Sequence, residues 1–212
     1  LVLLYERTGD ARYLEGARYF VHQVSNEAGG GRYLQTGRVR RPIAEYPVRR
    51  WEGVHNLSTL CELYRVTGDD DYRKAAEGLY ATLRDGERHN TGGFSTDEGF
   101  LGTPHVTGTI ETCCTVAWLA VSIDVLRMTG DPRVADEIEW STLNAALGAI
   151  PYGGTTSSYS NPPDGLRDYG NEIRGQAPNA GPDLNCCSTN ACRGPGMIAL
   201  WALMAGRDGV PY

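Results

Sequence analysis

Two pairs of adjacent cysteines are the residues of this sequence whose types and spacing indicate chemistry. The first pair, Cys113 and Cys114, lies just after Glu111, and the second pair, Cys186 and Cys187, lies far along the chain. Thiolate sulfur and carboxylate oxygen are ligands that zinc takes, usually in sets of three or four. Because Glu111, Cys113, Cys186 and Cys187 would supply four such ligands, the sequence predicts a zinc site.

Buried or disulfide-bonded cysteines are the alternative interpretation of the two pairs. Free cysteine is among the most buried residue types, but two adjacent cysteines can pair with each other only in a strained geometry. We expect Cys61 to lie in the core, Cys114 to pack at the start of a buried helix, and Cys192 to point away from the metal. Metal content with ligand identity would separate the two interpretations.

The composition narrows the classes of function. The chain has 212 residues, of which 41% are hydrophobic and 22% are charged, and its formal net charge is -6. These values are typical of a folded globular protein, and the acidic balance argues against binding to nucleic acid. No uninterrupted apolar run has the length of a membrane helix. We therefore expect no nucleic-acid partner and no membrane, while the oligomeric state stays open.

The two ends of the sequence resemble the interior of a longer protein. The chain starts at Leu1 as though inside a helix, without a methionine or a signal-peptide pattern, and it stops at Tyr212 after a turn-forming stretch. We expect a piece of a longer protein, and cytoplasmic localisation is the working expectation.

A repeated Thr-Gly-Asp triplet organises the chain. It occurs at residues 8–10, 67–69 and 129–131, with a looser fourth copy at residues 205–208. Glycine ends a helix by adopting the left-handed conformation, and the following aspartate can cap the next helix. After the third copy, Pro132 stands where the first residue of a helix tolerates a missing N–H. Each copy therefore predicts a hairpin of two helices.

Apolar residues at three- and four-residue spacing define buried helix faces beside the triplets. Such stripes run over residues 13–24 and 72–83, and residues 114–128 are apolar nearly all round, which is typical of an interior helix. Recurring hairpins joined by long loops predict an all-α fold. We expect an (α/α) barrel or toroid of helical hairpins, in the form of an incomplete (α/α)6 barrel.

Long polar connections separate the hairpins, and functional residues are expected there. Residues 27–50, 86–110 and 151–185 are rich in glycine, proline and polar side chains, and compact domains seldom keep such loops without a function. Within the last connection, residues 155–159 predict a short strand. The sequence has no phosphate-binding loop or dinucleotide fingerprint, so nucleotide cofactors are not expected.

The order of these motifs resembles glycoside hydrolase family 127, the β-L-arabinofuranosidases and their relatives. Glu-Thr-Cys heads an apolar helix and is followed by a Thr-Gly-Asp-Pro hairpin, a long loop, Cys-Cys and Asn-x-x-Arg-Gly. The resemblance implies an (α/α)6 barrel, here one catalytic domain over residues 1–212 truncated at both ends. It also implies a carbohydrate substrate, zinc held by Glu111, Cys113, Cys186 and Cys187, and Cys186 as the nucleophile of a retaining mechanism.

The resemblance further implies a glutamate acid/base upstream of the metal ligands. Glu98, in a glycine-rich loop, is the candidate, Asp97 is the alternative, and a solvated acidic pair is the non-catalytic interpretation. His55, His105 and Tyr159 are candidate substrate-binding residues, although a lone histidine is often only a packing residue. The family's histidine-led motif is altered around His55, which leaves a β-L-arabinofuranoside or a related sugar as the expected substrate.

Local chemistry agrees with these roles. A thiol becomes a strong nucleophile as the thiolate, which metal coordination or a helix N-terminus favours, and Cys186 would precede a helix predicted over residues 190–204. Glu111 and Cys113 are two residues apart, so they share a side only in extended chain and should lie just before a helix or in its first turn. Glu98 would protonate the leaving oxygen while Cys186 attacks the anomeric carbon.

Three other functions stay open at this point. An α-helical toroid with zinc also suits lanthionine-forming cyclases, but those use a Cys, Cys, His set and the second cysteine pair has no such partner. Four protein ligands normally mark a closed structural zinc site, as in a non-catalytic protein. A helical-repeat scaffold that binds peptides would bury its cysteines and bind no metal.

Overall fold

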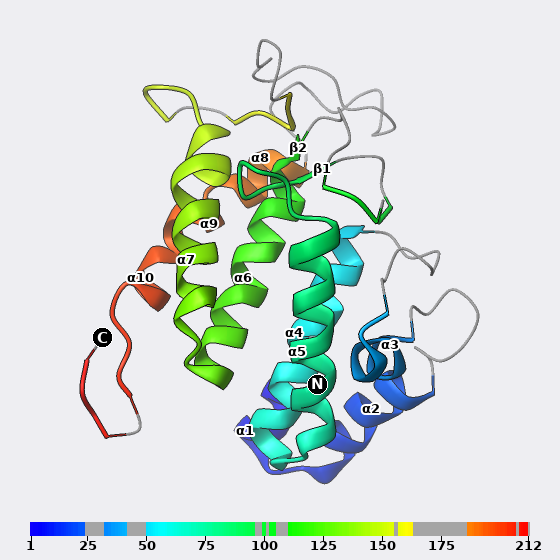
Figure 1. Cartoon of the computed structure of the whole chain (residues 1–212). Coiled ribbons are helices and arrows are strands. Elements are labelled where there is room, and N and C mark those ends of the chain that lie inside the picture. Colours follow the sequence, from blue (N-terminus) through cyan, green and yellow to red (C-terminus); the bar gives the residue numbers. More distant parts are fainter. Residues whose placement is uncertain are drawn as a thin grey trace.

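The computed structural model describes most of the chain, with α-helix as the main element (Figure 1). The described residues are 1–23, 32–41, 50–95, 99–100, 102–104, 110–154, 157–162, 186–206 and 208–211. The longer helices are α1 Val2–Thr8, α2 Ala11–His22, α3 Tyr33–Val39, α4 Arg50–Thr67, α5 Asp70–Gly86, α6 Thr112–Thr129 and α7 Pro132–Trp140. The remaining helices are the π-helix Ser141–Ala146, α8 Cys186–Ala191, α9 Arg193–Gly196 and α10 Ile198–Trp201.

Three of the four Thr-Gly-Asp copies form the predicted hairpins. Gly9 and Gly130 end α1 and α6 in the left-handed conformation, with φ of 70° and 66°, and Gly68 between α4 and α5 has φ of 69°. The aspartate of each copy caps the next helix by accepting a backbone N–H two residues further on. The triplet prediction is confirmed for these copies because each signal lies within one turn of the chain.

The fourth copy does not form a helix hairpin, so that prediction was wrong. Ala205 pairs with Pro211 in an isolated β-bridge, and the Gly206 N–H donates to the carbonyl of Val210. The preceding helix, α10, already ends at Trp201. The glycine therefore follows an irregular segment and has no helix to terminate.

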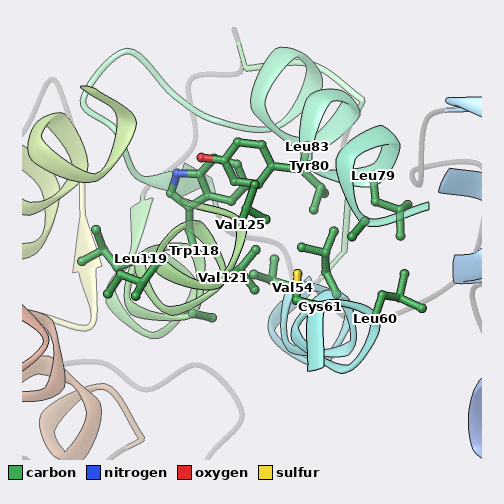
Figure 2. Packing of buried hydrophobic residues seen from close by; sticks show 14 of the residues in the cluster. Val54, Leu60, Cys61, Leu79, Tyr80, Leu83, Trp118, Leu119, Val121 and Val125 are labelled. Carbon is green, nitrogen blue, oxygen red and sulfur yellow. The ribbon is translucent and has the colours of Figure 1, made fainter. Parts of the chain in front are cut away.

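The core lies between α4, α5 and α6 (Figure 2). Tyr80 of α5 stacks on Trp118 of α6 with ring centroids 4.4 Å apart, and the Tyr80 and Ser122 hydroxyls form a hydrogen bond of 3.0 Å. Cys61 of α4 points into this cluster, and burial raises the pKa of its thiol. The prediction that Cys61 is a core residue is confirmed, and such a thiol is chemically inert.

The interior position predicted for α6 is also confirmed. The sequence analysis expected no stretch as long and apolar as a membrane helix, but α6 reaches that length and hydropathy. Among the described residues, α6 is the one helix long and apolar enough to cross a membrane, and 72% of that stretch is buried inside the protein. The core helix of a compact domain meets the same criterion, because its side chains need apolar neighbours on every side. We therefore assign α6 to the core.

Two predicted helical features differ in the structure. The predicted helix over residues 190–204 is broken into α8, α9 and α10, since Pro195 lacks the N–H that a continuous helix requires and is flanked by glycines. On α2 the predicted apolar stripe is buried only in part: Ala17 and Val21 are buried, but Phe20 is 55% exposed.

A small antiparallel sheet lies at the end of the helices where α6 begins (Figure 1). It consists of β1 Phe94–Ser95, β2 Ile110–Glu111 and β3 Ser160–Asn161, in the order β1-β2-β3. Glu111 pairs with Phe94 on one side and with Ser160 on the other. The predicted strand over residues 155–159 is thus displaced to residues 160–161, while residues 155 and 156 lie outside the described part. The sheet fixes where Glu111 enters α6.

Asp124 on α6 makes the stability depend on pH. Burial raises the pKa of its carboxyl group to about 6, opposed by a hydrogen bond from Ser58. Because the pKa is higher in the folded state than in the unfolded state, the protonated carboxyl group contributes stability that is fully present below the unfolded-state pKa. This stability is lost as the pH rises through about 6. Asp124→Asn should therefore be about 2 kcal/mol more stable than the wild type at pH 8 and nearly equal at pH 4.

Urea unfolding at the two pH values measures this difference. Asp136→Asn is the matched control, because Asp136 lies on the exposed side of α7 and its replacement should change stability little at either pH. An equal effect of Asp124→Asn at pH 4 and pH 8 would contradict the assignment.

Candidate metal and catalytic site

The four predicted metal ligands come together at the sheet end of the helices. One ligand atom from each of Glu111, Cys113, Cys186 and Cys187 lies within 4.8 Å of the others. The Cys113 and Cys187 sulfur atoms are 3.2 Å apart, and the Cys113 N–H donates to the Cys187 sulfur at 3.3 Å. Three of the four residues are buried, while Cys186 is half-buried. The junction of β2 with α6 and the distant helix α8 thus build one compact group of donors.

The first two ligands share a side because the chain changes conformation between them. Glu111 is extended, with φ of -89° and ψ of 128°, and α6 begins at Thr112. This agrees with the expectation that Glu111 and Cys113 lie at a helix start, since an extended residue followed by one helical turn brings positions two apart together. The buried Thr112 hydroxyl donates to the Ser158 carbonyl at 2.6 Å and accepts from the Asn161 amide at 2.9 Å. The sheet therefore holds the α6 N-terminus in place.

The donor chemistry of this cluster fits a thiophilic divalent cation. Hydrogen bonding to Cys186 raises the pKa of the Cys113 thiol, and hydrogen bonding to Cys113 raises the pKa of the Cys187 thiol. Three thiols and a carboxylate this close repel one another electrostatically when several of them are ionised. A bound cation offsets this repulsion and favours the ionised forms. Sulfur-rich sets with one carboxylate suit zinc among the common metals. The cluster could hold a metal ion.

The cysteines outside the cluster lie where the sequence predicted. None of the six cysteines, all of which lie in the described part of the chain, forms a disulfide. Cys114 is fully buried and its thiol donates to a Glu111 carboxylate oxygen at 3.3 Å. Cys192 is exposed, and its thiol points to the Thr189 carbonyl at 3.4 Å. Neither Cys61 nor Cys192 belongs to the metal cluster, and the disulfide interpretation has no support in the structure.

Comparisons with known proteins identify the family of this chain. The family model described as "Beta-L-arabinofuranosidase, GH127 catalytic domain" matches residues 1–199. The chain belongs to this family. A search of curated proteins finds no match.

Three solved structures share the fold. A family 127 β-arabinofuranosidase has a TM-score of 0.70 and 22% identity over 94% of this chain and 31% of that chain. A family 127 β-L-arabinofuranosidase from Geobacillus stearothermophilus has a TM-score of 0.68 and 20% identity over 98% and 37% of the two chains. A glycoside hydrolase has a TM-score of 0.73 and 19% identity over 98% and 38%. The present chain spans about a third of the length of each of these relatives. The similarity confirms the prediction of a mostly helical, (α/α)-barrel-like fold.

One expectation for the surroundings of Cys186 in this family 127 domain needs correction. Cys186 was expected to precede a helix over residues 190–204, but it is the first residue of α8, which has only 6 residues. The helix macrodipole builds up from aligned peptide units, so a helix this short contributes little to thiolate stability. The α8 N-terminus therefore gives little support for ionisation of Cys186.

The structure describes only some of the predicted substrate-binding and acid/base residues. His55 on α4 is half-buried with its ring 4.6 Å from Trp51, and burial, followed by the charge of Arg193, lowers its pKa. Its buried Nε2 has no hydrogen-bond partner within the described part of the chain. Tyr159 is half-buried, and its carbonyl accepts the Thr112 N–H at 3.2 Å. Three further candidates lie outside the described residues, namely Asp97, Glu98 and His105.

Sequence reasoning assigned no role to two side chains beside the group of four predicted ligands in this family 127 domain. Arg50, on α4, is 1% exposed, and its guanidinium donates to the Gly99 carbonyl. Burial, followed by the charge of Glu111, raises the pKa of the Cys114 thiol, and the charge of Arg50 opposes that shift. Asn190, on α8, places its amide nitrogen 3.6 Å from the Cys113 sulfur. The sequence offered one signal for Asn190: it lies four residues after Cys186, and residues four apart are neighbours on the surface of a helix.

Proposed function

We propose that this chain carries the catalytic residues of a retaining glycosidase that acts on a β-L-arabinofuranoside or a related sugar. The observation that carries the proposal is the convergence of Glu111, Cys113, Cys186 and Cys187 in a family 127 catalytic domain. Zinc is the proposed metal because the donor set is three sulfurs and one carboxylate. When bound, zinc would keep the cysteine sulfurs ionised near neutral pH.

In the proposed mechanism, two side chains divide the chemistry. Glu98 protonates the leaving oxygen as the Cys186 thiolate attacks the anomeric carbon, so the C–O bond breaks and a C–S bond forms. Glu98, now a carboxylate, deprotonates a water molecule that attacks the same carbon. The C–S bond breaks, the thiolate returns, and two inversions give net retention.

The burial of the four ligands supports Cys186 as the attacking group. Cys113 and Cys187 are buried, whereas Cys186 is half-buried at the start of α8, and a nucleophile must be reached by its substrate. His55, His105 and Tyr159 are the proposed contacts to sugar hydroxyls. For His55 the support is a buried, unpartnered Nε2 in the described part, which gains a hydrogen bond when a hydroxyl binds.

A closed structural zinc site is the second candidate function. Four protein ligands fill a tetrahedral site, and three of them are buried. The lanthionine-cyclase alternative is weaker, since the cluster formed by the described residues has no histidine. Cytoplasmic localisation, a single domain, and the absence of nucleic-acid and membrane partners stay predictions.

Hydrolysis of 4-nitrophenyl β-L-arabinofuranoside by the zinc-loaded chain, with the configuration of the product followed by NMR, tests the proposal. We expect retention. Glu98→Gln should keep zinc content and folding, and should slow an alkyl arabinofuranoside by roughly 10²- to 10⁴-fold. The 4-nitrophenyl substrate should lose less, because its leaving group needs little protonation.

The difference between the two substrates is the decisive readout for Glu98. Asp97→Asn tests the alternative acid/base: if Glu98 has that role, this variant should keep the wild-type rate on both substrates. Equal losses on both substrates would make Glu98 a binding residue, and product inversion would contradict the covalent mechanism.

A further inference from the structure

The side-chain amide of Asn190 connects the two elements that carry the metal ligands. Its nitrogen donates to the Cys186 carbonyl at 2.9 Å and lies 3.6 Å from the Cys113 sulfur, which is within reach of a hydrogen bond to sulfur. An amide nitrogen has two hydrogens, so both contacts can form at once. One contact stays within α8 and the other crosses to the first turn of α6. Asn190 therefore touches a ligand atom and the backbone of a second ligand.

Arg193 fixes the orientation of this amide. The Arg193 Nη1 donates to the Asn190 Oδ1 at 2.8 Å. If the amide turned over, its oxygen would face the Cys113 sulfur and its NH₂ group would face the guanidinium, so both interactions would become repulsive. With Arg193 in place, the N–H groups must face the sulfur. A charged residue outside the cluster thus determines which end of the amide the cluster meets.

We propose that Asn190 is a positioning residue of the metal centre, held in orientation by Arg193. Its N–H fixes the Cys113 sulfur and disperses part of the thiolate charge, and it anchors the backbone of Cys186 at the same time. Hydrogen bonds from groups around a metal site orient its ligands and tune metal affinity. The proposal rests on the metal site proposed above, and it adds residues that contribute no ligand atom.

Thr189 provides a matched control on the same helix. Its hydroxyl also donates to the Cys186 carbonyl, at 2.9 Å, but the contacts described for it do not include the Cys113 sulfur. Thr189→Val therefore removes a hydrogen bond to the same backbone carbonyl and leaves the sulfur contact intact. Asn190→Asp keeps the size of the side chain and its pairing with Arg193, but it replaces the donor with a negative charge. Asn190→Ala removes both contacts without adding charge.

Zinc affinity, measured by competition with a chromophoric chelator, is the first readout. We expect Asn190→Asp and Asn190→Ala to weaken zinc binding by about 10- to 100-fold, and Thr189→Val to change it by less than about threefold. Cobalt substitution is the second readout, because the sulfur-to-cobalt charge-transfer band reports on the thiolates directly. That band should shift in both Asn190 variants and stay in place in Thr189→Val. Melting of the metal-free variants shows which of them still fold.

Each outcome decides the proposal. Wild-type affinity and an unshifted cobalt band in a folded Asn190→Ala variant would overturn the role of Asn190 and leave the metal site standing. A wild-type chain that binds neither zinc nor cobalt would overturn both. If Asn190→Asp does not fold without metal, the zinc affinity of Asn190→Ala decides the question. Equal losses of zinc affinity in Asn190→Ala and Thr189→Val would show that only the contact with the Cys186 carbonyl matters, and would contradict the proposed role of the sulfur contact.

Discussion

Replacement of Cys186 by serine should abolish turnover, with kcat reduced by about 10⁴-fold or more, while some zinc binding remains. A serine hydroxyl is far harder to ionise than a thiol, so the variant keeps a similar shape but lacks the attacking group. The Cys187→Ser variant should mainly weaken metal binding, since Cys187 is buried and its thiol is hydrogen-bonded to the Cys113 sulfur. Steady-state kinetics at saturating zinc, with metal content measured on the same samples, separates the two effects.

Chemical labelling identifies the reactive sulfur independently of turnover. An L-arabinofuranose mimic that carries an iodoacetamide or epoxide group should label Cys186 in preference to the other five cysteines. Plain iodoacetamide is the control reagent, because it should label the exposed Cys192 without requiring a sugar pocket. Labelling of Cys192 or Cys61 by the sugar reagent, with Cys186 inert, would contradict the covalent mechanism and favour a structural metal site.

The parts of the fold that could be predicted are those with signals inside one helical turn. A glycine that takes φ near 70° and an aspartate that caps the next helix are local events, and three hairpins follow from them. The interior position of α6 follows from its own apolar residues. The fourth triplet failed because the preceding helix, α10, ends at Trp201, before the glycine of the triplet, Gly206. The predicted helix over residues 190–204 is interrupted where Pro195 lacks a backbone N–H, which outweighed the apolar spacing around it.

The composition of the candidate site could be predicted, but its assembly could not. Residue chemistry alone selected Glu111, Cys113, Cys186 and Cys187, because few other residue types bind a thiophilic metal. Their approach to within 4.8 Å depends on β1 and β3 pairing with β2 and on α8 packing against α6. Such long-range pairings leave little trace in the local sequence. Asn190 was missed for the same reason, since its sulfur contact crosses between α8 and α6.

Removal of the bound metal should cause a large loss of stability. Without a cation, three thiols and a carboxylate crowd together, with the Cys113 and Cys187 sulfurs 3.2 Å apart. A metal that binds only the folded state stabilises it by about 4 kcal/mol at a thousandfold excess over Kd. For a domain of this size, chelation should therefore lower Tm by roughly 10 °C.

Calorimetry before and after chelation, together with elemental analysis, measures the effect. We expect about one zinc per chain, with zinc–sulfur distances of roughly 2.3 Å by X-ray absorption. Cys192→Ser is the matched control: Cys192 lies on the same segment as the second cysteine pair but points to the Thr189 carbonyl, so its replacement should leave zinc content and Tm unchanged. Cys113→Ser should lower both, because it removes a buried ligand. A metal-free chain with the same Tm as the zinc-loaded chain, or a disulfide between Cys113 and Cys186, would leave the cluster as a group of buried thiols and remove the physical basis for a zinc-bound nucleophile.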